Sequence, residues 1–283
     1  MKKVKITCDS TCDLTRELYE KYDIDVTALG VTLGDETFHD GVDIAAENVF
    51  AYVAKCGTLP KTSAVSIGEY TDLFEKYTSE GYAVVHINIC SDMSSCHQNA
   101  KIAAADFEDV YPIDSRNLST GSGHLVIEAA KMAEAGMEAS EIAARLNELQ
   151  KNLDVSFVLQ TLDYLKKGGR CSGVVALGAN LLQLRPEIEV VNGAMKVGKK
   201  YRGSAEKSIF DYIRGRLEGR TDLVLDRIFV THSHVPAPIV EKAIALVKEL
   251  HPFTEVIETV AGCTISSHCG PSCLGVLFFK KGE

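Results

Sequence analysis

The stretch from Leu165 to Arg170, with the sequence LKKGGR, combines three basic side chains with two glycines. It opens a window, from Lys166 to Lys207, that holds nine Lys or Arg residues and three Glu residues. This is an excess of six positive charges in a chain of net charge −9. A local cationic field in an acidic protein favours a site for a small anion. The glycines let the backbone turn sharply and approach whatever the Arg170 guanidinium binds. A solvated lysine face beside a helix-ending glycine pair is the alternative.

Three further polar clusters lie where strands or helix starts should leave loops. They are Thr62-Ser63 in KTSAVS, Ser94-Ser95 in CSDMSSCHQNA, and His268 in SSHCGPS. Hydroxyl groups at a helix N-terminus, together with backbone N–H groups, form a neutral binding site for an anion. For each Ser/Thr pair the alternative is helix capping, and for His268 it is a structural hydrogen bond.

Sequence motifs for nucleophilic catalysis and nucleotide binding are missing. There is no G-x-S-x-G and no G-x-x-x-x-G-K-[ST]. Cys96-His97 and His268-Cys269 are sequence neighbours, whereas a catalytic Cys and His normally come from distant segments. We therefore predict no catalytic residue and a protein that binds rather than converts its ligand. An enzyme that uses His268 as a base on a small carboxylate or acyl ester is the alternative.

Composition excludes several other classes. The nine cysteines are odd in number and irregularly spaced, which favours reduced thiols. The tightest Cys/His group, from Cys263 to Cys273, does not have zinc-ligand spacing, so we expect no metal and no cofactor. A pI near 5.4 argues against nucleic acid. Without a long apolar run or a secretory leader, the sequence predicts a cytoplasmic protein with no stable membrane insertion.

The elements that must position these residues alternate between strand and helix in the first half of the chain. Ala83 to Ile89 is a largely apolar run that suits a buried parallel strand, and Asp109 to Ile113 is another. Ser66 and Glu69 form an S-x-x-E capping box ahead of a helix. This alternation predicts βαβ units and a parallel sheet, in which ligands bind at the carboxyl ends of the strands.

The second half predicts a mixed sheet. Asn192-Gly193, between two extended runs, is a strong hairpin signal, and we also expect a helix from Val174 that ends before Pro186. The fold class is therefore α/β with two domains. We place an N-terminal parallel βαβ domain at residues 1–152 and a C-terminal mixed-sheet domain at residues 153–283.

Taken together, these clusters resemble the DegV family of bacterial fatty-acid-binding proteins, over essentially the full length. The LKKGGR element followed late in the chain by H-x-G-P is quite specific. The resemblance is carried by CDSTCDL at 8–14, KTS at 61–63, DS at 114–115, TLDYLKKGGR at 161–170, RP at 185–186, YRG at 201–203 and HCGP at 268–271.

The resemblance implies a carrier that buries one long-chain fatty acid, such as palmitate or stearate, between or within its domains. A separate fatty acid kinase would phosphorylate the bound carboxylate, and the acyl phosphate would pass to phospholipid synthesis. Arg170 and Arg202 match the family's basic positions, suited to the phosphorylated product or to kinase docking. The residues implied near the carboxylate are Thr62, Ser63, Ser94, Ser95 and His268. A binding module for another amphiphile is a further alternative.

Four positions depart from the family pattern. Ser95 replaces a usual glycine and Cys96 a usual threonine, while Val65 and Ser272 replace a usual proline and glycine. Ser95 adds a hydroxyl where close backbone approach is usual, so we expect an altered geometry around the head group.

Overall fold

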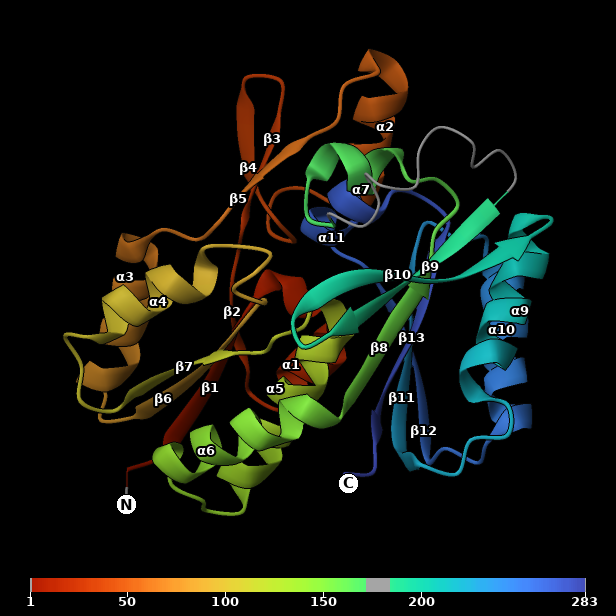
Figure 1. Ribbon diagram of the computed structural model, residues 1–283. Coiled ribbons are helices and arrows are strands. Elements are labelled where there is room, and N and C mark those ends of the chain that lie inside the picture. Colours follow the sequence, from red (N-terminus) through yellow and green to blue (C-terminus); the bar gives the residue numbers. More distant parts are fainter. Residues whose placement is uncertain (1, 172–183, 283) are drawn as a thin grey trace. The chain divides into compact units, whose positions relative to one another are not determined.

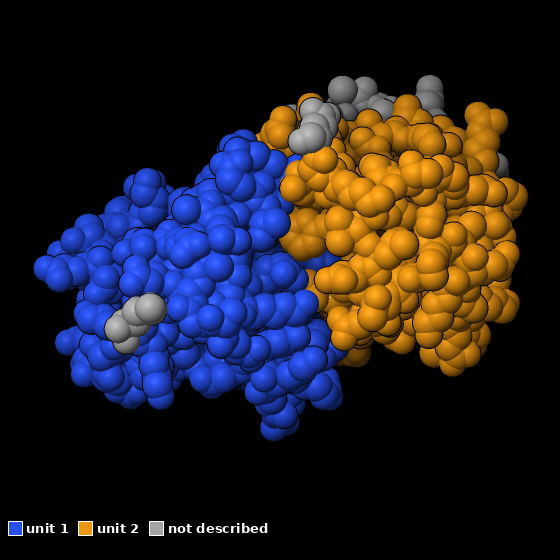
Figure 2. Space-filling view, turned by 90° about the horizontal axis from the view of Figure 1, so that it is seen from below, with its two compact units in different colours: residues 1–44, 61–151 blue, residues 45–60, 152–283 orange. Residues whose placement is uncertain are grey.

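The computed structural model describes residues 2–171 and 184–282, and Figure 1 shows the arrangement of its elements. The chain divides into two compact units, coloured separately in Figure 2. Unit 1 comprises residues 1–44 and 61–151, and unit 2 comprises residues 45–60 and 152–283. This division differs from the expected domains of 1–152 and 153–283 at one segment. Residues 45–60, which contain helix α2 (Ala46–Cys56), pack with the second half of the chain.

Unit 1 is built on a four-stranded parallel sheet in the order β2-β1-β6-β7. Helices α3 and α4 pack together, as do α5 and α6, and the two pairs cover opposite faces of the sheet (Figure 1). The strands are β1 (Val4–Asp9), β2 (Asp25–Thr27), β6 (Ala83–Asn88) and β7 (Val110–Asp114). The helices are α1 (Arg16–Lys21), α3 (Ile67–Ser79), α4 (Cys96–Ala104), α5 (Ser119–Glu134) and α6 (Ala139–Leu149).

Local sequence accounts for these elements. Every residue of β6 is buried, which fits its apolar run and its position inside the sheet. The predicted capping box forms at the start of α3: Glu69 N donates to Ser66 Oγ at 3.2 Å, and Ser66 N donates to the Glu69 carboxylate at 2.8 Å. These two bonds satisfy backbone donors that the first helical turn leaves free.

A second, three-stranded antiparallel sheet in unit 1 has the order β4-β3-β5. Its strands are β3 (Gly30–Leu33), β4 (Glu36–His39) and β5 (Lys61–Ser63). Gly34, with a φ of 65°, makes the turn between β3 and β4. The sequence predicts a loop at the KTS segment, but the segment forms β5, because its backbone pairs with the neighbouring strand β3.

Unit 2 is built on a six-stranded sheet in the order β10-β9-β8-β13-β11-β12. β11 and β12 are parallel and the other neighbours are antiparallel, so the predicted mixed sheet is confirmed. Asn192 and Gly193, both with positive φ, form the β9–β10 turn. The strands are β8 (Leu153–Val158), β9 (Leu184–Val191), β10 (Ala194–Arg202), β11 (Leu223–Ser233), β12 (Glu255–Val260) and β13 (Cys273–Lys280).

Helices α9 (Ala205–Leu217) and α10 (Ala237–Leu250) pack on this sheet, around a core that includes Tyr212, Val247 and Phe278. Two short helices, α7 (Asp163–Gly168) and α11 (Cys263–Cys269), contact each other. The helix expected from Val174 falls in residues 172–183, outside the described residues. Within the described ranges, no helix has both the length and the apolar character needed to cross a membrane.

Candidate functional site

Helices α7 and α11 of unit 2 fit closely at two glycines. A Cβ on Gly168, the last residue of α7, would overlap Nδ1 of His268 on α11. A Cβ on Gly270, just after α11, would lie 2.7 Å from Cδ2 of Tyr164. Real side chains do not approach this closely, so both positions require glycine if the helices are to stay together. Gly168 of LKKGGR and Gly270 of HCGP therefore allow their two segments to lie in contact.

The His268 imidazole is neutral over the ordinary pH range. Burial, and then the positive charge of Arg170, lower its pKa from 6.5 to about 4. Desolvation disfavours the imidazolium, and a nearby guanidinium repels it. A neutral imidazole offers one N–H donor and one acceptor nitrogen, so it can orient an anion through a hydrogen bond without forming an ion pair.

The rest of LKKGGR ends α7 and places Arg170. Leu165 is fully buried, and Gly169 adopts a left-handed conformation (φ 70°) while its N–H donates to the Leu165 carbonyl at 3.1 Å. Arg170 is exposed, and its Nη1 donates to the Gly168 carbonyl oxygen at 2.7 Å. Its guanidinium therefore stays beside the segment that packs on His268.

Arg202 lies at the end of β10, where it pairs with Leu184 of β9. Its side chain is exposed and forms no hydrogen bond or ion pair with residues 2–171 or 184–282. Both predicted basic positions, Arg170 and Arg202, thus belong to unit 2 and are exposed.

In unit 1, Thr62 and Ser63 lie on β5 rather than in a loop. Thr62 pairs with Val31 and Ser63 with Gly30. Thr62 is half-buried and Ser63 exposed. A Cβ at residue 30 would overlap Ser63 Oγ, so Gly30 provides the space for this hydroxyl. Neither residue caps a helix, since Ser66 caps α3.

Ser94 and Ser95 lie between β6 and α4. Ser94 is half-buried: its Oγ accepts a hydrogen bond from Cys96 N at 3.3 Å and donates to Cys96 Sγ at 3.2 Å. Burial, with the nearby Asp9, raises the pKa of the Cys96 thiol to about 12, so it is protonated at neutral pH. Ser95 is exposed at the N-cap of α4, with no side-chain capping bond.

The two hydroxyl clusters are tied together within unit 1. Asn99 of α4 donates from Nδ2 to the carbonyl oxygen of Val65 at 2.7 Å, three residues beyond Thr62. Helices α3 and α4 also pack on each other. The segment that carries Thr62 and Ser63 is therefore anchored to the helix that follows Ser94 and Ser95.

A buried carboxylate that was not predicted organises this end of the parallel sheet. Asp9, at the end of β1, is fully buried and accepts hydrogen bonds from Tyr70 Oη at 2.6 Å, His86 Nε2 at 3.1 Å and Ile89 N at 2.9 Å. Asn88 Nδ2 lies 3.3 Å from both Asp9 carboxylate oxygens. A charged residue directly after an apolar strand, with His86 and Asn88 inside another apolar strand, was the available signal.

Metal ligands do not gather in the part of the chain that the structure describes. Among the residues that it describes, no three His, Cys, Asp or Glu side chains come close enough to hold a metal ion. All nine cysteines are free thiols; Cys56 is exposed and the others are buried.

Comparison with known proteins gives consistent matches along the whole chain. A model of the DegV family, described as one of uncharacterised proteins, matches residues 3–281. A DegV domain-containing protein of Clostridium acetobutylicum is 33% identical over 285 residues, which cover 99% of this chain and all of that protein.

Solved structures agree with the sequence matches. A DegV family protein of Thermus thermophilus, described by its fatty acid binding, is 27% identical with a TM-score of 0.87, covering 99% of this chain and 100% of that one. A protein of Thermotoga maritima, whose structure is described as revealing a fatty acid binding function, is 26% identical with a TM-score of 0.82 and the same coverage. A family match from residue 3 to residue 281, joined to full-length likeness in sequence and fold, places the chain in the DegV family.

Proposed function

We propose that this protein binds one long-chain fatty acid, such as palmitate or stearate. The observation that carries the proposal is the full-length likeness to the Thermus thermophilus protein, which is described by its fatty acid binding. Burying a chain of about 16 carbons, at ~0.8 kcal/mol per methylene, contributes on the order of 12 kcal/mol before the cost of association. The tail can therefore dominate affinity, and the head group needs only to be oriented.

The carboxylate-binding residues of this proposal are Thr62, Ser63, Ser94, Ser95 and His268. Hydroxyl groups and a neutral imidazole suit a ligand whose affinity comes from its tail, since they orient a carboxylate without a full counter-charge. The low pKa of His268 supports this role, because a cationic imidazole is disfavoured there at neutral pH. It also argues against His268 as a general base, because a base works best when its pKa is near the working pH.

The protein acts, in this proposal, as a carrier that presents the carboxylate to a separate fatty acid kinase. The exposed Arg170 and Arg202 are suited to the phosphorylated head group or to the kinase surface, because guanidinium groups bind phosphate oxygens in pairs. No catalytic residue is assigned to the carrier.

Mass spectrometry of the purified protein, under native and then denaturing conditions, tests the proposal. We expect a stoichiometric ligand that denaturation releases as a fatty acid of about 14 to 18 carbons, consistent with the tail energy above. Delipidated protein should take up added palmitate to the same stoichiometry. A protein that is empty as purified and also fails to take up palmitate would refute the proposal.

A further inference from the structure

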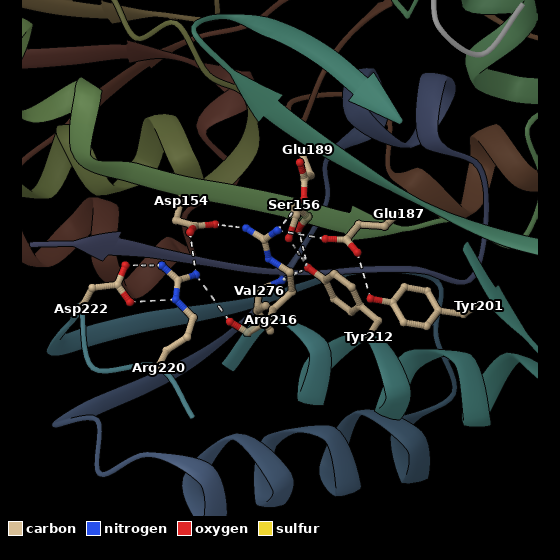
Figure 3. A network of polar contacts seen from close by, with 10 residues as sticks. All are labelled: Asp154, Ser156, Glu187, Glu189, Tyr201, Tyr212, Arg216, Arg220, Asp222 and Val276. Carbon is tan, nitrogen blue, oxygen red and sulfur yellow. Dashed lines mark hydrogen bonds and ion pairs between the residues drawn. The ribbon is translucent and has the colours of Figure 1, made fainter. Parts of the chain in front are cut away.

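One face of the unit 2 sheet carries a row of polar side chains along β9. Ser156 and Val158 of β8 lie opposite Glu189 and Glu187 of β9, and Arg185 of β9 lies opposite Tyr201 of β10. Opposed residues of antiparallel strands share a face, and every second residue of one strand returns to it. Arg185, Glu187 and Glu189 therefore project from the same face of the sheet. Helix α9 lies over this face at Glu187 and Glu189, where its Arg216 reaches both carboxylates (Figure 3).

The carboxylates of this row are paired with arginines (Figure 3). Arg216 of α9 donates to Glu187 at 3.0 Å and to Glu189 at 2.7 Å, and it also pairs with Asp154. Arg220 donates to the second oxygen of Asp154 at 2.7 Å. Each of these acids thus has a cationic partner, which matters most for the fully buried Glu187, since buried charges must be paired.

Arg185 and Gln160 continue the row beyond this network, but residues 2–171 and 184–282 give them no charged partner. The Leu159 N–H donates to the Pro186 carbonyl at 3.0 Å, which extends the antiparallel pairing and sets Gln160 opposite Arg185. Arg185 Nη1 donates to the Gln160 carbonyl oxygen at 3.2 Å. Arg185 Nε and both amide atoms of the Gln160 side chain are buried and form no hydrogen bond within the described part of the chain. Buried polar atoms without partners are costly, so this pair is suited to a ligand.

We propose that Arg185 and Gln160 form a binding site for a phosphoryl group. With Nη1 bonded to the Gln160 carbonyl, Nε and Nη2 remain on one edge of the guanidinium, the arrangement that binds two oxygens of an oxyanion side by side. The Gln160 amide provides a further donor for a third oxygen. Arg202 pairs with Leu184, the residue next to Arg185, and adds positive charge at the same end of β9 and β10.

The donors of this pair match a phosphoryl group better than a carboxylate, because Nε and Nη2 of Arg185 and the amide of Gln160 can serve three oxygens. A phosphate monoester carries about −1.5 to −2 charges and three acceptor oxygens at neutral pH, against one charge and two oxygens for a carboxylate. The window from Lys166 to Lys207, which contains Arg185, has six excess positive charges. The assignment rests on the proposed function, since the acyl phosphate formed from the bound fatty acid would supply this group. Inorganic phosphate has the same chemistry and is tested separately.

The experiment measures the affinities of hexadecyl phosphate and palmitate for the delipidated wild type, Arg185→Gln and Lys196→Gln. Lys196 is an exposed lysine of the same cationic window, so its substitution removes the same charge without the guanidinium. We expect Arg185→Gln to weaken hexadecyl phosphate binding by about tenfold or more, as for a lost charged hydrogen bond, and palmitate binding by less than about threefold. Lys196→Gln should weaken both by less than about threefold, because an exposed charge is screened.

Two results would overturn the assignment: equal weakening of both ligands by Arg185→Gln, or an equal effect of Lys196→Gln. A large fall in the ligand-free unfolding temperature of Arg185→Gln would mean that the guanidinium is structural, and Gln160→Leu, which keeps the side-chain volume, then decides. If Gln160→Leu weakens hexadecyl phosphate binding more than palmitate binding, the site stands; if it does not, the assignment is wrong. Thermal shifts with inorganic phosphate form a separate arm. If inorganic phosphate raises the unfolding temperature of the wild type but not that of Arg185→Gln, then inorganic phosphate is enough to occupy the site. A wild type that binds phosphate but no palmitate would refute the carrier proposal and leave the site standing.

Discussion

Gly168 of α7 leaves the space that the imidazole of His268 fills, since a Cβ at residue 168 would overlap Nδ1 and lie 3.2 Å from Cε1. Gly168→Ala should push the imidazole out of place. We expect the free energy of unfolding to fall by about 1–3 kcal/mol, as overpacking does, and palmitate affinity to fall by about tenfold. Denaturant unfolding and ligand titration measure the two effects. Gly68→Ala in α3, whose Cβ would meet nothing closer than 4.0 Å, is the control and should not lower either value.

Stability should depend on pH through His268. The unfolded chain binds a proton at this residue below pH 6.5, whereas the folded chain does so only near pH 4. This contribution is therefore fully present above about pH 6.5 and is lost as pH falls toward 4. We expect a loss of about 2 kcal/mol between pH 7 and pH 4.5 that His268→Gln does not show. Urea unfolding at the two pH values would contradict the assignment if both proteins lost the same amount.

Arg170 should matter after ligand binding rather than during it. We expect Arg170→Ala to bind palmitate within about twofold of the wild type but to support slower acyl-phosphate formation by a partner kinase, because the guanidinium matches phosphate oxygens. Lys167→Ala, which removes another exposed cation of the same segment, is the matched control. An Arg170→Ala protein that purified without lipid would contradict the role. A second check is NMR: removing this charge should raise the pKa of His268.

The hydroxyl groups should contribute less than the tail. Thr62→Val combined with Ser94→Ala should lower palmitate affinity by a few kcal/mol at most, since each hydrogen bond contributes about 0.5–1.5 kcal/mol. Calorimetric titration measures the change, and circular dichroism confirms the fold. Complete loss of binding in the folded double variant would mean that the head group, not the tail, supplies most of the affinity.

Asp9 should be essential for the stability of unit 1. In the wild type, Tyr70 Oη, His86 Nε2 and Ile89 N donate to the two oxygens of the Asp9 carboxylate. Asp9→Asn leaves only one acceptor oxygen for these three donors. We expect a loss of about 2–4 kcal/mol in the free energy of unfolding. Tyr70→Phe, which removes one of these bonds, should cost less, about 1 kcal/mol. A variant as stable as the wild type would mean that water replaces the missing bonds.

Much of the fold could be predicted because its signals are local. The apolar run of β6, the Ser66–Glu69 capping box and the Asn192-Gly193 turn each depend on neighbours within a few residues. The assignment of α2 to unit 2 could not be predicted in this way. Its partners, α11 and His234, lie far along the chain, and an amphipathic pattern does not say which surface it will cover.

The candidate site shows the same division. The sequence contains Gly168 and His268, but only the fold reveals that one makes room for the other. The pKa of His268 depends on burial and on Arg170, both of which are set by tertiary structure. Arg185 was part of a recognised motif, yet the missing partner of its Nε is visible only once the neighbouring acids are seen to be paired with Arg216.

The placement of α2 has a consequence for the order of folding. The chain passes between the two units at 44/45, 60/61 and 151/152, so no single cut yields both units whole. During synthesis α2 emerges long before α11. The residues that α2 buries in the folded protein, such as Val49, therefore stay exposed until the last part of the chain has been made. A ribosome-bound fragment ending near residue 151 could complete the sheet of unit 1, but it would carry α2 as an unsatisfied amphipathic helix that chaperones can recognise.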